Sequence, residues 1–221
     1  MEVTIKLIRE AVKVAIDEIA ANDAEFASGQ DNAEADTIID SKIEEAIDYV
    51  HRLANIGLMQ GDVFLTVPTG QPNAGVASVT IATDRIARFV KAEAVGWKYP
   101  VTIAYEATDD EYAIATDPYV GGSVNHPMVT MSQSAGSIVF TIYKTSSTAS
   151  GSGTITYIPL AERIESEADN AQPEDDSYYI DANMYQAVIY RIAGLVEMTY
   201  GEERAKVLLE MANTLIGISA N

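Results

Sequence analysis

The sequence contains no cysteine among its 221 residues. This absence excludes disulfide bridges, thiolate metal sites and cysteine nucleophiles, and it leaves the redox compartment open. Basic residues are also scarce, since 14 Lys and Arg stand against 33 Asp and Glu, for a formal net charge of −19. So few cations cannot neutralise many phosphates, and tight nucleic-acid binding is therefore disfavoured.

Long apolar runs are missing as well. No stretch approaches eighteen consecutive apolar residues, so we expect no transmembrane helix and no membrane partner. The chain begins with alternating charged and apolar residues, and we see no signal peptide. Hydrophobic residues nevertheless make up 48% of the sequence, which is enough for a chain of this length to bury a core in one or two domains.

Catalytic and metal-binding patterns are weak throughout. The two histidines, His51 and His126, fall in different segments, and no nucleophile elbow, zinc-protease motif, P-loop or dinucleotide-binding glycine pattern is present. The acidic runs Asp109-Asp110-Glu111 and Asp175-Asp176 offer oxygens of the kind that Ca²⁺ prefers, but they lack the spacing of an EF-hand loop. We interpret them as an exposed turn and an acidic linker, and we expect no enzyme, no cofactor and no metal.

The negative charge is concentrated at the two ends of the chain. Residues 1–61 carry 13 acids and 5 bases, residues 62–159 carry 8 and 5, and residues 160–221 carry 12 and 4. Between Pro118 and Tyr143 there is no charged residue at all. Because exposed β-surfaces usually carry charges that prevent edge-to-edge pairing, this stretch is either deeply buried or covered by another chain.

Helical periodicity marks both ends of the sequence. Apolar residues recur every three or four positions in four segments, which predicts two pairs of helices. Asp36 or Asp40 is the expected N-cap of the second helix, and Asp181 is that of the third. The expected helices cover approximately 3–19, 36–54, 184–196 and 202–216.

The central region instead has the two-residue period of β-strands. Seven or so short strands, separated by Gly, Pro and Asn, predict an antiparallel sandwich or partial barrel. The expected strands lie near 63–67, 79–81, 86–95, 101–105, 112–116, 128–131, 138–143 and 154–158.

Taken in order, these segments resemble the head-to-tail adaptor proteins of short-tailed bacteriophages, also called connector or ring proteins. The resemblance spans nearly the whole chain through short motifs in a fixed order. These are the helix Leu7–Ile19, the acidic helix Ile43-Glu44-Glu45-Ala46-Ile47-Asp48, the turn Asp117-Pro118, the strand Thr154-Ile155-Thr156-Tyr157-Ile158-Pro159, the segment Ile180–Arg191 and Glu203-Arg204-Ala205.

The resemblance implies an α+β fold in which helices from both chain ends form one bundle and carry an inserted antiparallel β-sandwich or partial barrel. The implied parts are an N-terminal helical hairpin at 1–61, a β-rich insertion at 62–159, an acidic connector at 160–177, and a C-terminal helical hairpin at 178–221 that packs on 1–61.

The function it implies is structural. Copies are expected to form a dodecameric ring in the virion, at the head–tail junction, after assembly in the host cytoplasm. The expected partners are the portal protein and other tail or ring proteins. DNA is expected only as cargo passing through the ring, where an acidic wall prevents adhesion.

Two sets of residues follow as candidates for this role. The acids expected to face the channel are Asp40, Glu44, Glu45, Asp48, Glu162, Glu165, Glu167 and Asp169. The residues expected at subunit interfaces are Tyr119, Val124, Met128, Val129, Met131, Ile138, Phe140 and Ile142.

One alternative remains open on the sequence alone. The chain has twelve tyrosines and a single tryptophan, and aromatic side chains on a β-sandwich can form a platform for sugars. In this reading the protein is a carbohydrate- or ligand-binding module that uses Trp97 or Tyr119. Packing in the core or between subunits is the competing explanation for these aromatic residues.

Overall fold

The structure is a computed structural model that describes residues 1–20, 32–70, 73, 75–117, 121–143, 153–199 and 202–218. The fold is mixed α and β, and the chain divides into two compact units. The first unit, the end unit, combines Met1–Val63 with Ala161–Asn221, and the second, the middle unit, is Phe64–Leu160. The two ends of the chain therefore belong to the same compact body.

Four helices dominate the end unit, and their existence confirms the helical periodicity of the sequence. On the first helix Ile5, Ile8, Val12 and Ala15 are buried at three- and four-residue spacing. The helices are α1 (Ile5–Ala20), α2 (Asn32–Leu53), α4 (Tyr185–Glu197) and α5 (Glu202–Leu215).

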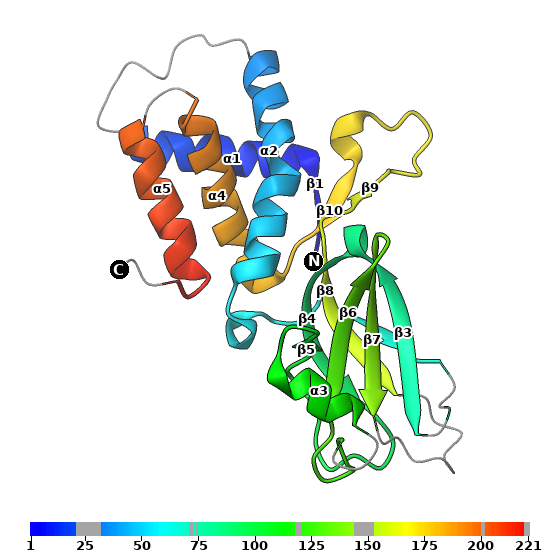
Figure 1. Cartoon of the computed structure of the whole chain (residues 1–221). Coiled ribbons are helices and arrows are strands. Elements are labelled where there is room, and N and C mark those ends of the chain that lie inside the picture. Colours follow the sequence, from blue (N-terminus) through cyan, green and yellow to red (C-terminus); the bar gives the residue numbers. More distant parts are fainter. Residues whose placement is uncertain are drawn as a thin grey trace. The chain divides into compact units, whose positions relative to one another are not determined.

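Helix α4 is the centre of the end unit, because it contacts α1, α2 and α5 (Figure 1). Among its own residues, Val188, Ile192 and Ala193 are buried. Its closest neighbour is α5, which packs against Gly194. A Cβ at this position would lie 2.7 Å from the side chain of Leu209, so the glycine allows the two helices to approach.

A small antiparallel sheet completes the end unit. Its strands are β1 (Glu2–Thr4), β10 (Ser177–Tyr179) and β9 (Arg163–Ile164), in the order β1-β10-β9. The strand β1 joins the beginning of the chain to the segment before α4, with Val3 opposite Tyr178. The range 160–177, expected as a solvated connector or short acidic helix, thus contains β9 and the short 3-10 helix η3 (Pro173–Asp175).

The middle unit contains two sheets. One is ordered β2-β8-β4, and the other is ordered β3-β7-β6-β5. Most neighbouring strands are antiparallel, but β5 runs parallel to β6, which a purely antiparallel prediction misses. The strands are β2 (Leu65–Pro68), β3 (Val76–Ala82), β4 (Ile86–Glu93), β5 (Tyr105–Glu106), β6 (Val129–Ser134), β7 (Ser137–Tyr143) and β8 (Thr154–Pro159).

The core of the middle unit is formed by side chains from both sheets. Ile155 of β8 and Ala92 of β4 come from one sheet, and Phe140 and Ile142 of β7 come from the other. Phe140 is fully buried and stacks on Phe89, with 5.4 Å between the ring centroids. Alternating strand residues from each sheet therefore bury one shared apolar layer.

The predicted strand at 112–116 is wrong, because these residues belong to helix α3 (Asp110–Thr116). Two physical features explain the error. Ala113 and Ala115 have the highest helix propensity, and Asp110 and Glu111 lie in the first turn, where the helix dipole favours negative charge. Alternation over five residues is too short to outweigh these features.

The expected N-cap of the second helix is also wrong. Helix α2 begins at Asn32, so Asp36 and Asp40 lie inside it rather than at its end. Their carboxylates instead pair with Arg9 and Lys13 of α1, as described below. By contrast, Asp181 does cap the short 3-10 helix η4 (Ala182–Met184) before α4, where its side chain accepts a hydrogen bond from the Asn183 N–H group.

Candidate functional site

The four candidate acids of α2 all have partners within the chain. Asp40 accepts two hydrogen bonds from Arg9, at 2.8 and 2.6 Å, in a bidentate pair. Glu44 accepts a hydrogen bond from the Tyr178 hydroxyl at 3.0 Å. Asp48 and Glu45 also have partners: the Ala161 N–H group donates to Asp48 at 2.7 Å, and Lys42 lies 3.5 Å from Glu45.

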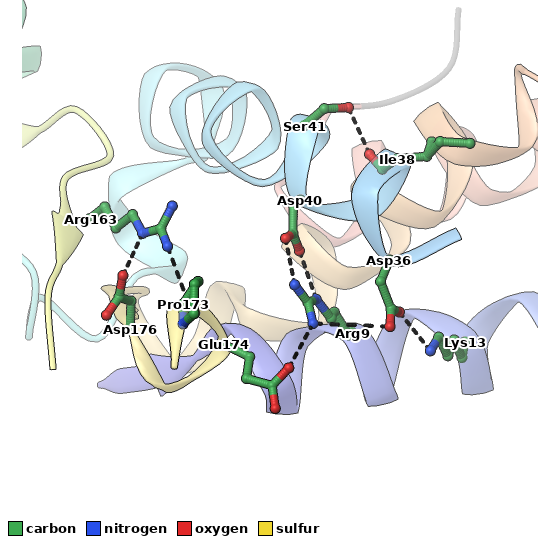
Figure 2. Close-up of polar contacts among 10 residues, drawn as sticks. All are labelled: Arg9, Lys13, Asp36, Ile38, Asp40, Ser41, Arg163, Pro173, Glu174 and Asp176. Carbon is green, nitrogen blue, oxygen red and sulfur yellow. Dashed lines mark hydrogen bonds and ion pairs between the residues drawn. The ribbon is translucent and has the colours of Figure 1, made fainter. Parts of the chain in front are cut away.

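Arg9 stands at the centre of a network of carboxylates (Figure 2). Besides Asp40, it binds Glu174 of η3 at 3.2 Å, and Asp36 lies 4.0 Å away and pairs with Lys13 at 2.6 Å. The hydrogen bond with Asp40 is the main reason that the pKa of Arg9 is raised. The network thus joins α1, α2 and η3. It holds Asp40, which was expected to face the channel, in contacts within the same chain.

A second arginine holds the connector in the same way. Arg163 of β9 donates a hydrogen bond to Asp176 at 2.8 Å (Figure 2). The Ser166 N–H group donates to the other carboxylate oxygen at 2.9 Å. The Ser166 bond and the Arg163 guanidinium both lower the pKa of Asp176. Asp175, the other acid of this predicted linker, accepts a hydrogen bond from the Gln172 N–H group.

The candidate acids of the connector differ from those of α2. Glu162, Glu165, Glu167 and Asp169 are all exposed. Within the part of the chain that the structure describes, no hydrogen bond or ion pair involves their carboxylates. Of the eight candidate acids, these four therefore present the least compensated negative charge to the surroundings.

The candidate interface residues of the middle unit fall into three groups. Tyr119 lies outside the described residues. Val124 is exposed, and Met128, Met131 and Ile138 are partly buried. The remaining residues, Val129, Phe140 and Ile142, are 0% exposed in the unit's own core, so their assignment to a subunit interface is wrong. For these three positions the absence of charge is explained by burial.

Asp181 has a second role that the sequence did not indicate. It is fully buried, and its two carboxylate oxygens accept hydrogen bonds from the N–H groups of Gln60 and Gly61, at 3.0 and 2.9 Å. The carboxylate therefore joins the two parts of the end unit, the end of Met1–Val63 and the segment before α4. Only its capping pattern is visible in the sequence, since the other two donors lie about 120 positions away.

The remaining polar candidates have structural roles in their own units. Asp109 accepts a hydrogen bond from the Glu106 N–H group at 2.7 Å, in the turn that precedes α3. His51 is buried in the last turn of α2, whereas His126 lies in an exposed turn and bonds to Ser123. Trp97 packs against the core of the middle unit, as expected for a structural aromatic side chain.

Among the described residues, no three His, Cys, Asp or Glu side chains come together in a way that would hold a metal ion. None of the described helices is both long and apolar enough to cross a bilayer. No protein family model matches the chain, and no curated protein is significantly similar to it.

Proposed function

We propose that this protein is a structural component of the bacteriophage virion that forms a ring at the head–tail junction, around a channel for DNA. Copies assemble side by side, dock on the portal protein, and carry further tail or ring proteins. The role requires no catalytic group, and DNA passes through the ring as cargo. The arrangement that the resemblance implies is a helical bundle from both chain ends with an inserted β-sandwich.

The observation that carries the proposal is the composition of the end unit. Helices from residues 1–63 and 161–221 form a single compact body, and Phe64–Leu160 forms the other. This division supports the arrangement that the resemblance to head-to-tail adaptors implies. The two-sheet core of the middle unit, with side chains from both β7 and β8, supports the sandwich arrangement.

The distribution of charge supports a DNA-conducting role. The end unit contains 26 acidic and 9 basic residues, whereas the middle unit contains 7 and 5. A strongly negative wall repels the phosphate backbone and keeps passing DNA from adhering. The exposed acids Glu162, Glu165, Glu167 and Asp169 are the best candidates for this wall, because the acids of α2 are engaged within the chain.

The middle unit is nearly neutral, whereas the end unit is strongly negative. Because the end units of two copies repel each other, the middle unit is the better candidate for contacts between copies. Val124, Met128, Met131 and Ile138 retain accessible surface there. In the proposed ring these side chains contact the neighbouring subunit. This set is smaller than the one expected from the sequence, because Val129, Phe140 and Ile142 of that set are buried in the core.

The test is direct imaging of the assembly. The purified chain is examined by mass photometry and negative-stain electron microscopy, alone and mixed with a purified bacteriophage portal complex. We expect closed rings with a central hole, either free or bound to the portal complex. A chain that stays monomeric in both samples contradicts the proposal.

Matched variants connect the assembly to the middle unit. Val124→Lys places a charge on a proposed contact side chain that is 41% exposed, and it is expected to reduce ring formation. Ile103→Lys places the same charge on a side chain of the same unit that is 59% exposed and outside the proposed contact, and it should assemble normally. Equal behaviour of the two variants contradicts this choice of interface.

A further inference from the structure

Residues 162–175 of the end unit lie between two anchored positions. On one side, Ala161 donates its N–H group to Asp48 of α2 at 2.7 Å. On the other side, Ser177 and Tyr178 are buried in strand β10, which pairs with β1. We call residues 162–175 the strap, because the chain is held firmly at both of its ends.

The strap itself has no buried side chain. Every residue from 162 to 175 is either exposed or only partly buried, whereas Asp176, the next residue, is buried. Segments with few buried apolar contacts open locally at a much smaller cost in free energy than the core of the same protein. The polar contacts of the strap with the rest of the end unit therefore decide whether it stays closed.

Two carboxylates make these contacts. Asp176 accepts hydrogen bonds from the Arg163 side chain at 2.8 Å and from the Ser166 N–H group at 2.9 Å. Glu174 of the strap binds Arg9 of α1 at 3.2 Å (Figure 2). A two-residue ladder between β9 and β10 adds to them. We call the contacts of Asp176 and Glu174 the latch.

The charge of the strap opposes the latch. The strap contains six acidic residues and one basic residue, which gives it a net charge of −5. Four of the six are exposed, and within the described part of the chain their carboxylates make no hydrogen bond or ion pair; they are Glu162, Glu165, Glu167 and Asp169. Because like charges repel, a segment of this composition favours an extended conformation. The closed strap thus depends on the specific contacts of the latch.

We propose that the strap is a conformational device, which opens from the end unit while the helices stay folded and is held closed by the latch of Asp176 and Glu174. The inference goes beyond the ring proposed above and does not depend on it. Opening carries the four exposed acids of the strap away from the helices. The end unit can therefore change the reach of its negative surface without any change in its helical core.

The test is native-state hydrogen exchange of the full chain, followed amide by amide with NMR. The N–H group of Ser166 reports on the strap, because its hydrogen bond belongs to the latch, and the most protected amides of α2 and α4 report on the helices. We expect Ser166 to exchange at least tenfold faster than these helical amides, but more slowly than in an unfolded peptide of the same sequence. Urea below the unfolding transition should speed the helical amides and not Ser166, because local opening exposes little surface.

A matched pair of variants tests the latch. Asp176→Asn removes the negative charge that faces Arg163, and it should speed the exchange of Ser166 by about tenfold while the helical amides keep their rates. Asp175→Asn is the control. It removes the same charge from the neighbouring residue, whose hydrogen bond from the Gln172 N–H group lies within the strap, and it should leave Ser166 unchanged.

Glu174→Gln tests the other half of the latch, at a side chain that is 47% exposed and outside the core. The change removes the ion pair with Arg9 and should speed the exchange of Ser166 by about threefold, since a partly exposed ion pair contributes little. Arg9 keeps its two hydrogen bonds to Asp40, so the amides of α1 and α2 should be unaffected.

Four results would overturn the inference. If Ser166 exchanges at the rate of the helical amides, the strap is a fixed part of the end unit. If Ser166 exchanges as fast as in the unfolded peptide, no latch holds the strap. If Asp175→Asn speeds Ser166 as much as Asp176→Asn does, the loss of charge and not the latch is responsible. If Asp176→Asn speeds the helical amides equally, this carboxylate stabilises the whole end unit.

Discussion

The middle unit carries 7 acidic and 5 basic residues, and the end unit carries 26 and 9, although the two are of similar size. Their internal contacts differ accordingly. The middle unit is organised by an apolar layer between two sheets, whereas the end unit adds carboxylates that join distant segments, such as Asp40 with Arg9 and Asp181 with Gly61. Acidity in the end unit is therefore part of its architecture as well as of its surface.

The largest effect is expected from Phe140→Ala in the middle unit. The side chain is fully buried and stacks on Phe89, so its truncation leaves a cavity and should lower the free energy of unfolding by about 3–5 kcal/mol. Calorimetry should show the loss in the transition of the middle unit. Ile103→Ala, at an exposed position of the same unit, is the control and should have little effect. An equal shift in both variants would contradict the apolar account of this unit.

A smaller effect is expected from Asp181→Ala in the end unit. The change leaves the N–H groups of Gln60, Gly61 and Asn183 without their buried acceptor, which should cost about 2–3 kcal/mol. Urea unfolding followed by circular dichroism at 222 nm reports mainly on the helices. Asp169→Ala removes an exposed carboxylate from the same unit and should be nearly neutral. If both variants lose the same stability, the effect comes from net charge and not from the buried contacts.

The smallest effect is expected from Glu197→Gln on α4. Burial raises the pKa of this carboxyl, an effect that Arg204 partly opposes, and its Oε1 atom is buried without a hydrogen-bond partner among the described residues. Because the folded pKa lies above the unfolded value of about 4.3, the folded chain binds more protons between the two, and stability falls as pH rises through that window. The variant removes this loss, so its melting temperature should match the original chain near pH 4 and exceed it by a few degrees at pH 7.

The control for this pH dependence is Glu165→Gln, which removes one negative charge from an exposed position of the same unit. A gain in the control as large as that of Glu197→Gln would attribute the effect to general charge repulsion. If the melting temperature of the Glu197→Gln variant equals that of the original chain at every pH, then burial of this carboxyl does not lower the stability.

The sequence predicted the four long helices because their buried stripes recur over many turns, as on Ile5, Ile8, Val12 and Ala15. The same signal is weak where an element is short. Strand β1 has three residues, and α3 has seven, of which the last five, Tyr112-Ala113-Ile114-Ala115-Thr116, also alternate like those of a strand. Helical periodicity also did not separate core residues from exposed ones, since the neighbours Leu7 and Ile8 both fit the apolar spacing of α1 but only Ile8 is buried.

The candidate site was harder to predict than the fold, because the role of a charge depends on its partner in space. Asp40 was expected on a channel surface or at a helix start, and the structure pairs it with Arg9, 31 positions earlier. In the middle unit, the absence of charge at Phe140 and at Val124 is the same signal in sequence, although one is core and the other is exposed. Composition therefore identifies uncharged regions but does not show which of their side chains are buried and which are exposed.

Pairing between β2 and β8 has a consequence for how the chain folds during synthesis. Leu65, next to the start of the middle unit, lies opposite Tyr157, three residues before its end, so the folded unit brings these two positions to within one strand spacing. The end unit then closes across a short bridge instead of a free loop of about a hundred residues, which lowers the entropic cost by roughly 3 kcal/mol. The middle unit is synthesised in full before the last helices, so its folding precedes the joining of the two ends of the chain within the end unit.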